Sequence, residues 1–336
     1  MHSQTLLVYG DVTVDIGLLI DDLPAVGLDT AATDQRITTG GAAANCAVAA
    51  ARLGSRVDVV ARVGDDLFSD HSIGNLDRYG VGTSAVQRTE GPSPLVVALI
   101  DSRGGRSFVS SRGPASGRIP SEVYLPRLGE AKMVHLSGYS FQDPGSRSVA
   151  LHLRDEARRR GIAVSLDPSA LFAENYRPES GWLEGIDYLY PNLHEATTIT
   201  GRSTPEEAAR ALRGLGAKAV VVTMGADGCL VLDDNGAMRI PAIRKFPVVD
   251  TTGAGDGFAG GFLAVTLAGG APAQAARVGT LVAARTISKR GGHTGSPSLD
   301  ELGDLARSMG DEDLQEAAEF LSGGMPSRAS ERIKGS

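Results

Sequence analysis

The chain contains 336 residues, with a net charge of −7, 42% apolar residues and 43 glycines. This length accommodates one large α/β domain or two smaller ones, and a composition rich in glycine and poor in aromatic residues is typical of closely packed α/β enzymes. The negative charge and the lack of a long basic block argue against nucleic acid and anionic membranes as partners.

Targeting signals and metal-binding cysteine patterns are missing from the sequence. The N-terminal residues lack the charged and apolar regions of a secretory signal, and no apolar run reaches the roughly 20 residues that a membrane helix needs. The two cysteines, Cys46 and Cys229, form no CxxC or zinc-binding spacing. We therefore expect a cytoplasmic protein whose thiols are reduced.

The first part of the chain predicts alternating strands and helices. A short apolar strand, Thr5–Tyr9, precedes an alanine-rich helix over Cys46–Leu53. The β-branched run Val57–Val63 predicts a second strand, and Phe68–Tyr79 has the pattern of a helix that ends at Gly80. Short apolar strands that alternate with helices indicate a parallel sheet covered on both faces.

Two segments, residues 16–39 and 86–111, do not follow this alternation. The second contains two predicted strands, Leu95–Asp101 and Arg106–Ser110, joined by a glycine-containing turn over residues 102–105. We expect the two segments to form a small β lid that emerges from the main sheet.

From Met133 the alternation of strand and helix becomes strict. The predicted strands are Met133–Leu136, Ile162–Asp167, Tyr188–Pro191, Ala219–Met224 and Cys229–Asp233. The predicted helices are Ser146–Arg160, His194–Thr200 and Thr204–Leu215, followed by an apolar helix over Gly257–Ala271. We expect one large domain over residues 1–308, while residues 309–336 hold a short helix, Asp313–Leu321, and a mobile tail.

The most informative motif is Asp250-Thr-Thr-Gly-Ala-Gly-Asp256, which precedes the apolar helix. Gly253 and Gly255 allow a tight turn with accessible backbone N–H groups, and the N-terminus of a helix attracts anions such as phosphate. A carboxylate repels a neighbouring phosphate, so Asp256 indicates a base that takes the proton from a hydroxyl attacking phosphorus. The structural alternative is a glycine turn with Asp256 in the first turn of the helix, where the helix dipole favours it.

Polar residues also lie near the edge of the sheet where ligands bind in open α/β folds. Asp11 and Asp15 follow the first strand and suit vicinal hydroxyls, although solvated loop acids would show the same pattern. Gly40, Gly41 and Asn45 form a second glycine turn before a helix, which would admit a polar ligand or serve only as a turn.

Two further motifs follow strands in the second half of the chain. Asn192 and Glu195 are one helical turn apart, which suits a hydrated Mg²⁺ and also a helix capping box. Thr223, Gly225 and Gly228 form a glycine turn that suits nucleotide phosphates or ribose and is otherwise a plain hairpin.

Other nucleotide-binding and catalytic motifs are absent from the sequence. It contains no GxxxxGK[ST] P-loop, no GxGxxG fingerprint after a predicted strand, no GxSxG elbow and no HExxH pair. These absences argue against a P-loop protein and a Rossmann dehydrogenase.

Taken together, the motifs resemble those of the ribokinase-like (PfkB) family of carbohydrate kinases. The N-terminal signature is Gly40-Gly-Ala-Ala-Ala-Asn45-Cys-Ala47 with Gly54 and Gly64 after it, and the C-terminal one is Asp250–Asp256 with Gly260-Gly261-Phe262 after it. With the motifs between them, the resemblance spans residues 5–300. It implies a three-layer α/β/α sandwich with a mostly parallel central sheet and a β lid, which in this family often closes over the sugar and can build a homodimer.

The resemblance also implies roles for individual residues. Asp256 would be the catalytic base, and Gly253, Ala254 and Gly255 would form an anion hole for the transferred phosphoryl group. The implied substrate contacts are Asp11, Asp15, Gly40, Gly41, Asn45 and Arg112. The implied ATP contacts are Asn192, Thr223, Gly225, Gly228, Ala284 and Gly292. Glu195 would meet Mg²⁺ through water, and Asp250 lies where many members hold a monovalent cation, which makes K⁺ a further candidate cofactor.

We therefore expect an ATP- and Mg²⁺-dependent kinase that phosphorylates the primary hydroxyl of a sugar or sugar acid. The sequence departs from the family at Asp167-Pro-Ser169, where many sugar kinases have Asp-x-Asn followed shortly by arginine; here the next arginine is Arg177, and this leaves the substrate class open. One alternative is a nucleoside kinase, which would need an aromatic wall of which the lid supplies only Phe108. The other is a ligand-sensing homologue without catalysis, against which the intact Asp256 argues.

Overall fold

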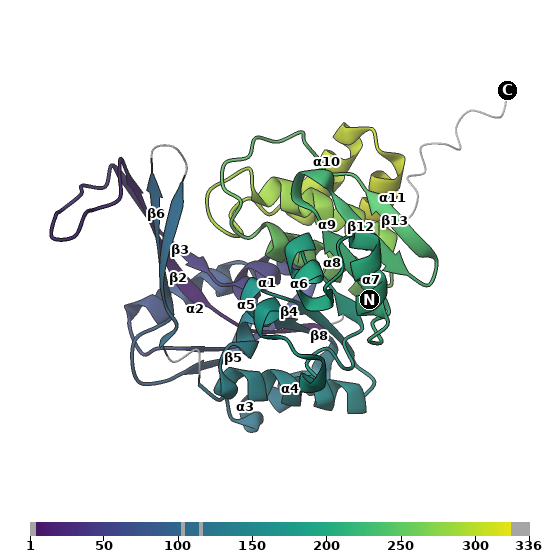
Figure 1. Ribbon diagram of the computed structural model, residues 1–336, viewed down its shortest axis with the longest axis horizontal. Coiled ribbons are helices and arrows are strands. Elements are labelled where there is room, and N and C mark those ends of the chain that lie inside the picture. The colour runs from purple at the N-terminus through teal and green to yellow at the C-terminus, as the bar shows by residue number, and fades with distance from the viewer. Residues whose placement is uncertain (1–4, 102–104, 114–116, 324–336) are drawn as a thin grey trace.

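The computed structural model describes residues 5–101, 105–113 and 117–323, which form a large sheet between two helical layers and a small sheet at one side (Figure 1). The predicted three-layer sandwich with a β lid is therefore confirmed. The turn expected at residues 102–105 lies mostly outside the described residues, as does the expected tail from residue 324 onward.

The large sheet has nine strands in the described part of the chain, in the order β13-β12-β11-β10-β9-β8-β1-β4-β5. The strands from β11 to β5 are parallel to their neighbours, whereas β12 and β13 form an antiparallel edge. The bounds are β1 (Thr5–Tyr9), β4 (Arg56–Val63), β5 (Gly82–Arg88), β8 (Ala131–Ser137), β9 (Ala163–Asp167), β10 (Tyr188–Leu189), β11 (Ala219–Thr223), β12 (Cys229–Asp233) and β13 (Gly236–Ile240).

Helices cover both faces of the large sheet and create two apolar cores. Alternate side chains of β1 enter different cores, because successive residues of a strand point to opposite faces. The helices on one face are α1 (Ala42–Arg52), α2 (Leu67–Arg78), α8 (Ala254–Leu267), α9 (Pro272–Thr286), α10 (Leu299–Met309) and α11 (Glu312–Leu321). Those on the other face are α3 (Ser121–Glu130), α4 (Pro144–Arg159), α5 (Ala170–Asn175), α6 (Leu193–Thr200) and α7 (Pro205–Arg213).

The C-terminal helix packs on the same domain. Leu314 and Ala317 of α11 are buried in the core that α8 and α9 share, so this helix is part of the sandwich layer. The domain boundary at residue 308 stays a prediction. Among the helices of the described segments, none combines the length and the apolar character needed to cross a membrane.

The small sheet forms the lid, in the strand order β3-β2-β6-β7. Its strands are β2 (Thr13–Ile20), β3 (Asp34–Gly40), β6 (Leu95–Asp101) and β7 (Arg106–Ser111). The second lid segment, predicted over residues 86–111, was too long, because residues 86–88 belong to β5, whose backbone pairs with β4 of the large sheet. Ile37, Phe108 and Val109 of the lid are exposed, and a homodimer through this sheet stays a prediction.

The structure contains helices α3, α5, α9 and α10, which the sequence patterns did not predict. In addition, the apolar helix α8 begins at Ala254, earlier than the predicted Gly257. Glycine lowers the intrinsic preference for helix, but Gly257, Gly260 and Gly261 are buried here, so packing outweighs propensity.

Helices α1 and α8 cross with their backbones in close contact. A Cβ added to Gly260 would lie 2.6 Å from the Cβ of Ala49 and 2.7 Å from the carbonyl oxygen of Cys46. Any larger residue would therefore push the helices apart. This contact matters for the site, because α1 carries Asn45 and α8 carries Asp256.

We expect Gly260→Val to lower the free energy of unfolding by about 1–3 kcal/mol, because overpacking would separate α1 from α8. Urea unfolding measures this change. Gly74→Ala in α2 is the matched control: no atom lies within 4 Å of the added Cβ, and alanine should stabilise this helix by about 0.5–1 kcal/mol. Unchanged stability of Gly260→Val would mean that the crossing does not depend on glycine.

Candidate active site

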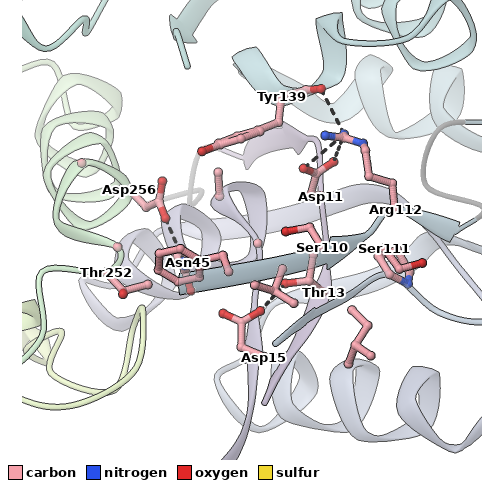
Figure 2. Close-up of a pocket in the computed structure, with 18 of the residues that line it drawn as sticks. Asp11, Thr13, Asp15, Asn45, Ser110, Ser111, Arg112, Tyr139, Thr252 and Asp256 are labelled. Atoms are coloured by element: carbon pink, nitrogen blue, oxygen red, sulfur yellow. Dashed lines mark hydrogen bonds and ion pairs between the residues drawn. The ribbon is translucent and has the colours of Figure 1, made fainter. Parts of the chain in front are cut away.

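A first cavity of about 540 Å³ lies between the lid and the carboxyl end of β1 (Figure 2). Its lining combines Asp11, which follows β1, with Asp15 of β2, Ser110 of β7, Asn45 of α1 and Asp256 of α8. Segments far apart in the chain therefore meet here, at the edge of the sheet where ligands bind in open α/β folds.

Asp256 lies in the first turn of α8, and its carboxylate faces the first cavity beside Asn45 (Figure 2). The Nδ2 group of Asn45 donates a hydrogen bond of 2.8 Å to Oδ2 of Asp256. Burial raises the pKa of Asp256 to about 6; the hydrogen bond from Asn45 lowers it, and the charges of Asp15 and Asp11 raise it further. A carboxylate with such a pKa is suited to act as a general base near neutral pH.

The start of α8 is the point where two cavities meet. Gly253 caps the helix in the left-handed conformation, with a φ of 75° and no side-chain cap. A Cβ at this position would overlap the carbonyl group of Gly292, so only glycine fits. Ala254 and Gly255 line both the first cavity and a second one. Uncapped N–H groups at a helix N-terminus attract an anion to this place.

Arg112 and Asp11 form an ion pair in the first cavity, away from Asp256 (Figure 2). Nη2 of Arg112 lies 3.2 Å from Oδ1 of Asp11 and donates to the carbonyl oxygen of Tyr139 at 3.1 Å. Burial raises the pKa of Asp11, while the charge of Arg112 lowers it. Arg112 is the one cationic side chain among the described residues that line the first cavity.

Asp15 lies on β2 beside the glycine turn that precedes α1. Oγ1 of Thr13 donates to Oδ1 of Asp15 at 2.7 Å, and burial raises the pKa of this carboxyl group. Gly41, the N-cap residue of α1, lines the first cavity, and its contact with a substrate stays a prediction. Gly40 is not among the described residues that line this cavity, and it leaves space for the Asp15 carboxylate; its substrate contact also stays a prediction.

The second cavity, of about 600 Å³, begins at the start of α8. It is lined by four residues predicted to contact the nucleotide, namely Thr223, Gly225, Gly228 and Ala284. Apolar side chains that were not predicted, including Ile243 and Phe246, complete its wall. An apolar cavity with a few polar groups is typical of a site for a planar cofactor such as a nucleobase.

Two residues predicted to contact the nucleotide, Asn192 and Gly292, are not among the described residues that line the second cavity. Asn192 forms a capping box at the start of α6: its Oδ1 accepts from Glu195 N at 2.9 Å, and Oε2 of Glu195 accepts from Asn192 N at 3.0 Å. The backbone of Gly292 packs instead against the side chain of Asn45. The capping alternative for Asn192 and Glu195 is thus observed.

Buried acids surround the start of α8. Burial raises the pKa of Glu195 to about 7, and burial together with the charges of Glu195 and Asp256 raises the pKa of Asp167 well above its usual range. Asp167 Oδ2 would lie 3.8 Å from a Cβ on Gly255. In the described segments, no three metal-binding side chains are arranged to hold an ion on their own.

Asp250 joins the loop before α8 to the loop after α9. Its Oδ1 accepts from the N–H of Thr252 at 2.9 Å, and its Oδ2 accepts from the N–H of Gly291 at 3.0 Å. These hydrogen bonds hold both loops beside the glycine turn. A role for Asp250 at a monovalent cation stays a prediction.

Tyr139 and His293 are further side chains of the site that the sequence did not predict. Tyr139 follows β8 and lines the first cavity, with its ring between Arg112 and Asp256 (Figure 2). It lies after a strand, the signal that selected Asp11, so it could have been found. His293 is 4% exposed and its Nδ1 lies 2.9 Å from Oδ1 of Asn45; only its place after a glycine pair marks it in the sequence.

Comparison with known proteins assigns the chain to a family. Residues 3–299 match the family described as pfkB family carbohydrate kinase. The chain belongs to this family. The kinase is 33% identical to 2-dehydro-3-deoxygluconokinase from Escherichia coli over 258 residues, which cover 70% of this chain and 82% of that one. It is also 33% identical to cytidine kinase from Thermococcus kodakarensis over 298 residues, which cover 85% and 97% of the two chains.

A solved structure supports the same assignment. Ribokinase from Arabidopsis thaliana, in complex with ribose and ATP, superposes on the kinase with a TM-score of 0.80 and 25% identity, covering 95% of this chain and 99% of that one. The predicted family, fold and enzyme class are confirmed: the protein is a phosphotransferase with an alcohol group as acceptor.

Proposed function

We propose that the kinase transfers the γ-phosphoryl group of ATP to a primary hydroxyl of a sugar or sugar acid, with Asp256 as the base. One observation supports this proposal above all: Ala254 and Gly255 line both cavities, whereas Asp256 lines only the first. An acceptor in the first cavity and a nucleotide in the second would meet at the uncapped start of α8. Asp256 then stands on the acceptor side, where a hydroxyl loses its proton.

The first turn of α8 would stabilise the charge that develops on the transferred group. Its N–H groups are fixed by the helix and need no reorganisation, which is how an anion hole lowers a barrier. Asp256 would orient the attacking hydroxyl and accept its proton. Because base and anion hole belong to one helical turn, their separation is set by helix geometry.

Mg²⁺ fits this arrangement as a partner of the nucleotide. Glu195, Asp167 and Asp256 lie near the start of α8, and burial raises the pKa of each carboxyl group. A bound cation would favour their ionised forms. Mg²⁺ commonly keeps several waters and binds through phosphate oxygens, so Glu195 would meet it through water. When bound, the ion would neutralise phosphate charge.

The first cavity suits a polyhydroxylated acceptor. Asp11 and Asp15 accept hydrogen bonds, and Asn45 both donates and accepts, which matches the groups of a sugar. If the acceptor is a sugar acid, Arg112 would bind its carboxylate. A 2-dehydro-3-deoxygluconokinase is among the relatives, which makes such an acceptor a candidate.

A nucleoside kinase is the second candidate, and Tyr139 favours it. With Phe108 it gives the first cavity two aromatic side chains, more than the lid sequence alone supplies. Aromatic faces suit a nucleobase, and cytidine kinase is among the relatives.

The direct test is ADP release with 2-dehydro-3-deoxygluconate, ribose and cytidine as acceptors, with and without K⁺. We expect wild type to phosphorylate one of the two sugars fastest. Asp256→Asn, which keeps the shape but not the base, should lose at least about 10²-fold in kcat while ATP affinity is retained. Turnover of Asp256→Asn at the wild-type rate would disprove the role of this base, and preference for cytidine would favour the second candidate.

The pH profile of kcat/KM should report the carboxyl group of Asp256 in the free enzyme. Because burial raises its pKa to about 6, the basic form disappears as pH falls through this value, and kcat/KM should drop about tenfold per pH unit below it. Asn45→Leu removes the hydrogen bond that lowers this pKa, so the acidic limb should move to higher pH. A limb that stays in place in Asn45→Leu would show that another group limits the rate.

Arg112→Leu should separate acidic from neutral acceptors. Loss of a charge-assisted hydrogen bond should raise KM for 2-dehydro-3-deoxygluconate by about tenfold or more and raise KM for ribose less. Arg112→Lys, which keeps the charge, is the control and should recover part of the loss. Equal increases for both acceptors would indicate that Arg112 serves only to neutralise Asp11.

A further inference from the structure

The buried ring of His293 connects the loop after α9 to helices α1 and α2. Its Nδ1 lies 2.9 Å from Oδ1 of Asn45, and its Nε2 lies 3.2 Å from Oδ1 of Asn75. The ring of Tyr79 meets it edge to face at a centroid distance of 5.4 Å. The ring therefore has a fixed place with a hydrogen-bonding partner on each nitrogen.

The amide of Asn45 has only one orientation that satisfies both of its partners. Oxygen and nitrogen of an amide have similar shape, so an unrestrained amide can turn by half a rotation. Here Nδ2 must donate to the carboxylate of Asp256. Oδ1 consequently faces Nδ1 of His293, which must donate.

The proton on Nδ1 determines the state of the other ring nitrogen. Burial, with a smaller effect from the charge of Arg52 beneath Tyr79, lowers the pKa of His293 to about 4, so the ring carries one proton at neutral pH. That proton is on Nδ1, which leaves Nε2 as an acceptor. In the structure Oδ1 of Asn75 faces this nitrogen at 3.2 Å. A half rotation of the Asn75 amide, whose oxygen and nitrogen have similar shape, would bring its Nδ2 there as the donor that Nε2 needs.

We propose that His293 is a positioning residue: its Nδ1–H holds the Asn45 amide so that Nδ2 donates to Asp256, and the Asn75 amide satisfies the other ring nitrogen. The proposal rests on the role proposed for Asp256. A series of side-chain hydrogen bonds thus leads from a half-buried residue of α2 to the reacting end of the first cavity, in the order Asn75, His293, Asn45 and Asp256.

The backbone around His293 supports this role. Gly292 packs so closely on Asn45 that a Cβ would overlap the amide, and the carbonyl group of Gly292 contacts the cap of α8 at Gly253. The amide therefore has little room to move. In the wrong orientation, Oδ1 of Asn45 would face the carboxylate of Asp256, and the two oxygens would repel each other.

The first test compares His293→Leu with His293→Asn. Leucine and asparagine have nearly the same size and leave the same space beside Tyr79, but only asparagine keeps a donor where Nδ1 was. With the best acceptor among 2-dehydro-3-deoxygluconate, ribose and cytidine, we expect kcat of His293→Leu to fall about tenfold. KM for ATP should stay unchanged, and His293→Asn should recover most of the loss. Equal losses in both variants would overturn the proposal.

Asn75→Ala keeps the test decisive if both His293 variants fail to fold. It should lower kcat about threefold, the effect of a weak hydrogen bond, with unchanged KM for ATP; unchanged kcat would overturn the proposal. Asp256→Asn is assayed in parallel. Full activity of Asp256→Asn would refute the proposed function itself. If Asp256→Asn is inactive but His293→Leu and His293→Asn lose the same fraction of kcat, only the positioning role is refuted.

The second test needs no acceptor. In protein labelled with ¹⁵N-histidine, NMR distinguishes a protonated ring nitrogen from a bare one, and loss of the signals in His293→Asn assigns them to this residue. We expect the proton on Nδ1. A bare Nδ1 would mean that His293 cannot donate to Asn45, and the proposal would be wrong.

Discussion

The hydrogen bond between Asn45 and Asp256 is the interaction on which the site depends, since it joins α1 to α8 about one helical turn before their closest contact. It requires the close approach that Gly260 permits. Burial and the neighbouring acids disfavour a charge on Asp256, while the Asn45 amide and the N-terminus of α8 favour it. The balance leaves a carboxylate that is ionised at neutral pH and still basic enough to take a proton. Separating the helices would change this balance before it changed the fold.

The two sheets have different tasks in this arrangement. The large sheet and its helices supply the start of α8, both cavity walls near it and the turn after β11, all of which would serve the nucleotide. Of these two cavities, the described part of the small sheet lines the first, through residues that include Asp15, Phe108 and Ser110. Changes in the lid can therefore alter the acceptor without moving the base or the anion-binding turn. This separation fits a family whose relatives act on a sugar acid and on a nucleoside.

Local signals in the sequence predicted most of the large sheet and selected several of the residues after strands that line the two cavities. Asp11, Thr223 and the turn before α8 were predicted because polar and glycine residues after a buried strand gather at one edge. The limits of the lid were not predicted correctly. They depend on the pairing of β5 with β4 and of β6 with β2, which are distant in the sequence, and a short sequence pattern carries no information on such pairing. His293 was missed for the same reason: its contact with Asn45 joins residues 248 positions apart. Gly40 and Gly292 were predicted as ligand contacts from their motifs. In the structure, the lack of a Cβ at these positions leaves space for the side chains of Asp15 and Asn45.

Charge decides what this site can hold. Asp11, Asp15 and Asp256 line the first cavity with Arg112 as their single described counter-charge there, and Asp167 and Glu195 add buried acids near the start of α8. Those acids that are ionised repel a bare triphosphate, while the N–H groups of one helical turn and Arg244 of the second cavity oppose that repulsion. A nucleotide accompanied by a cation meets far less repulsion than a free one. The acids that would bind and activate the acceptor would therefore also favour a nucleotide with a bound cation over a free nucleotide.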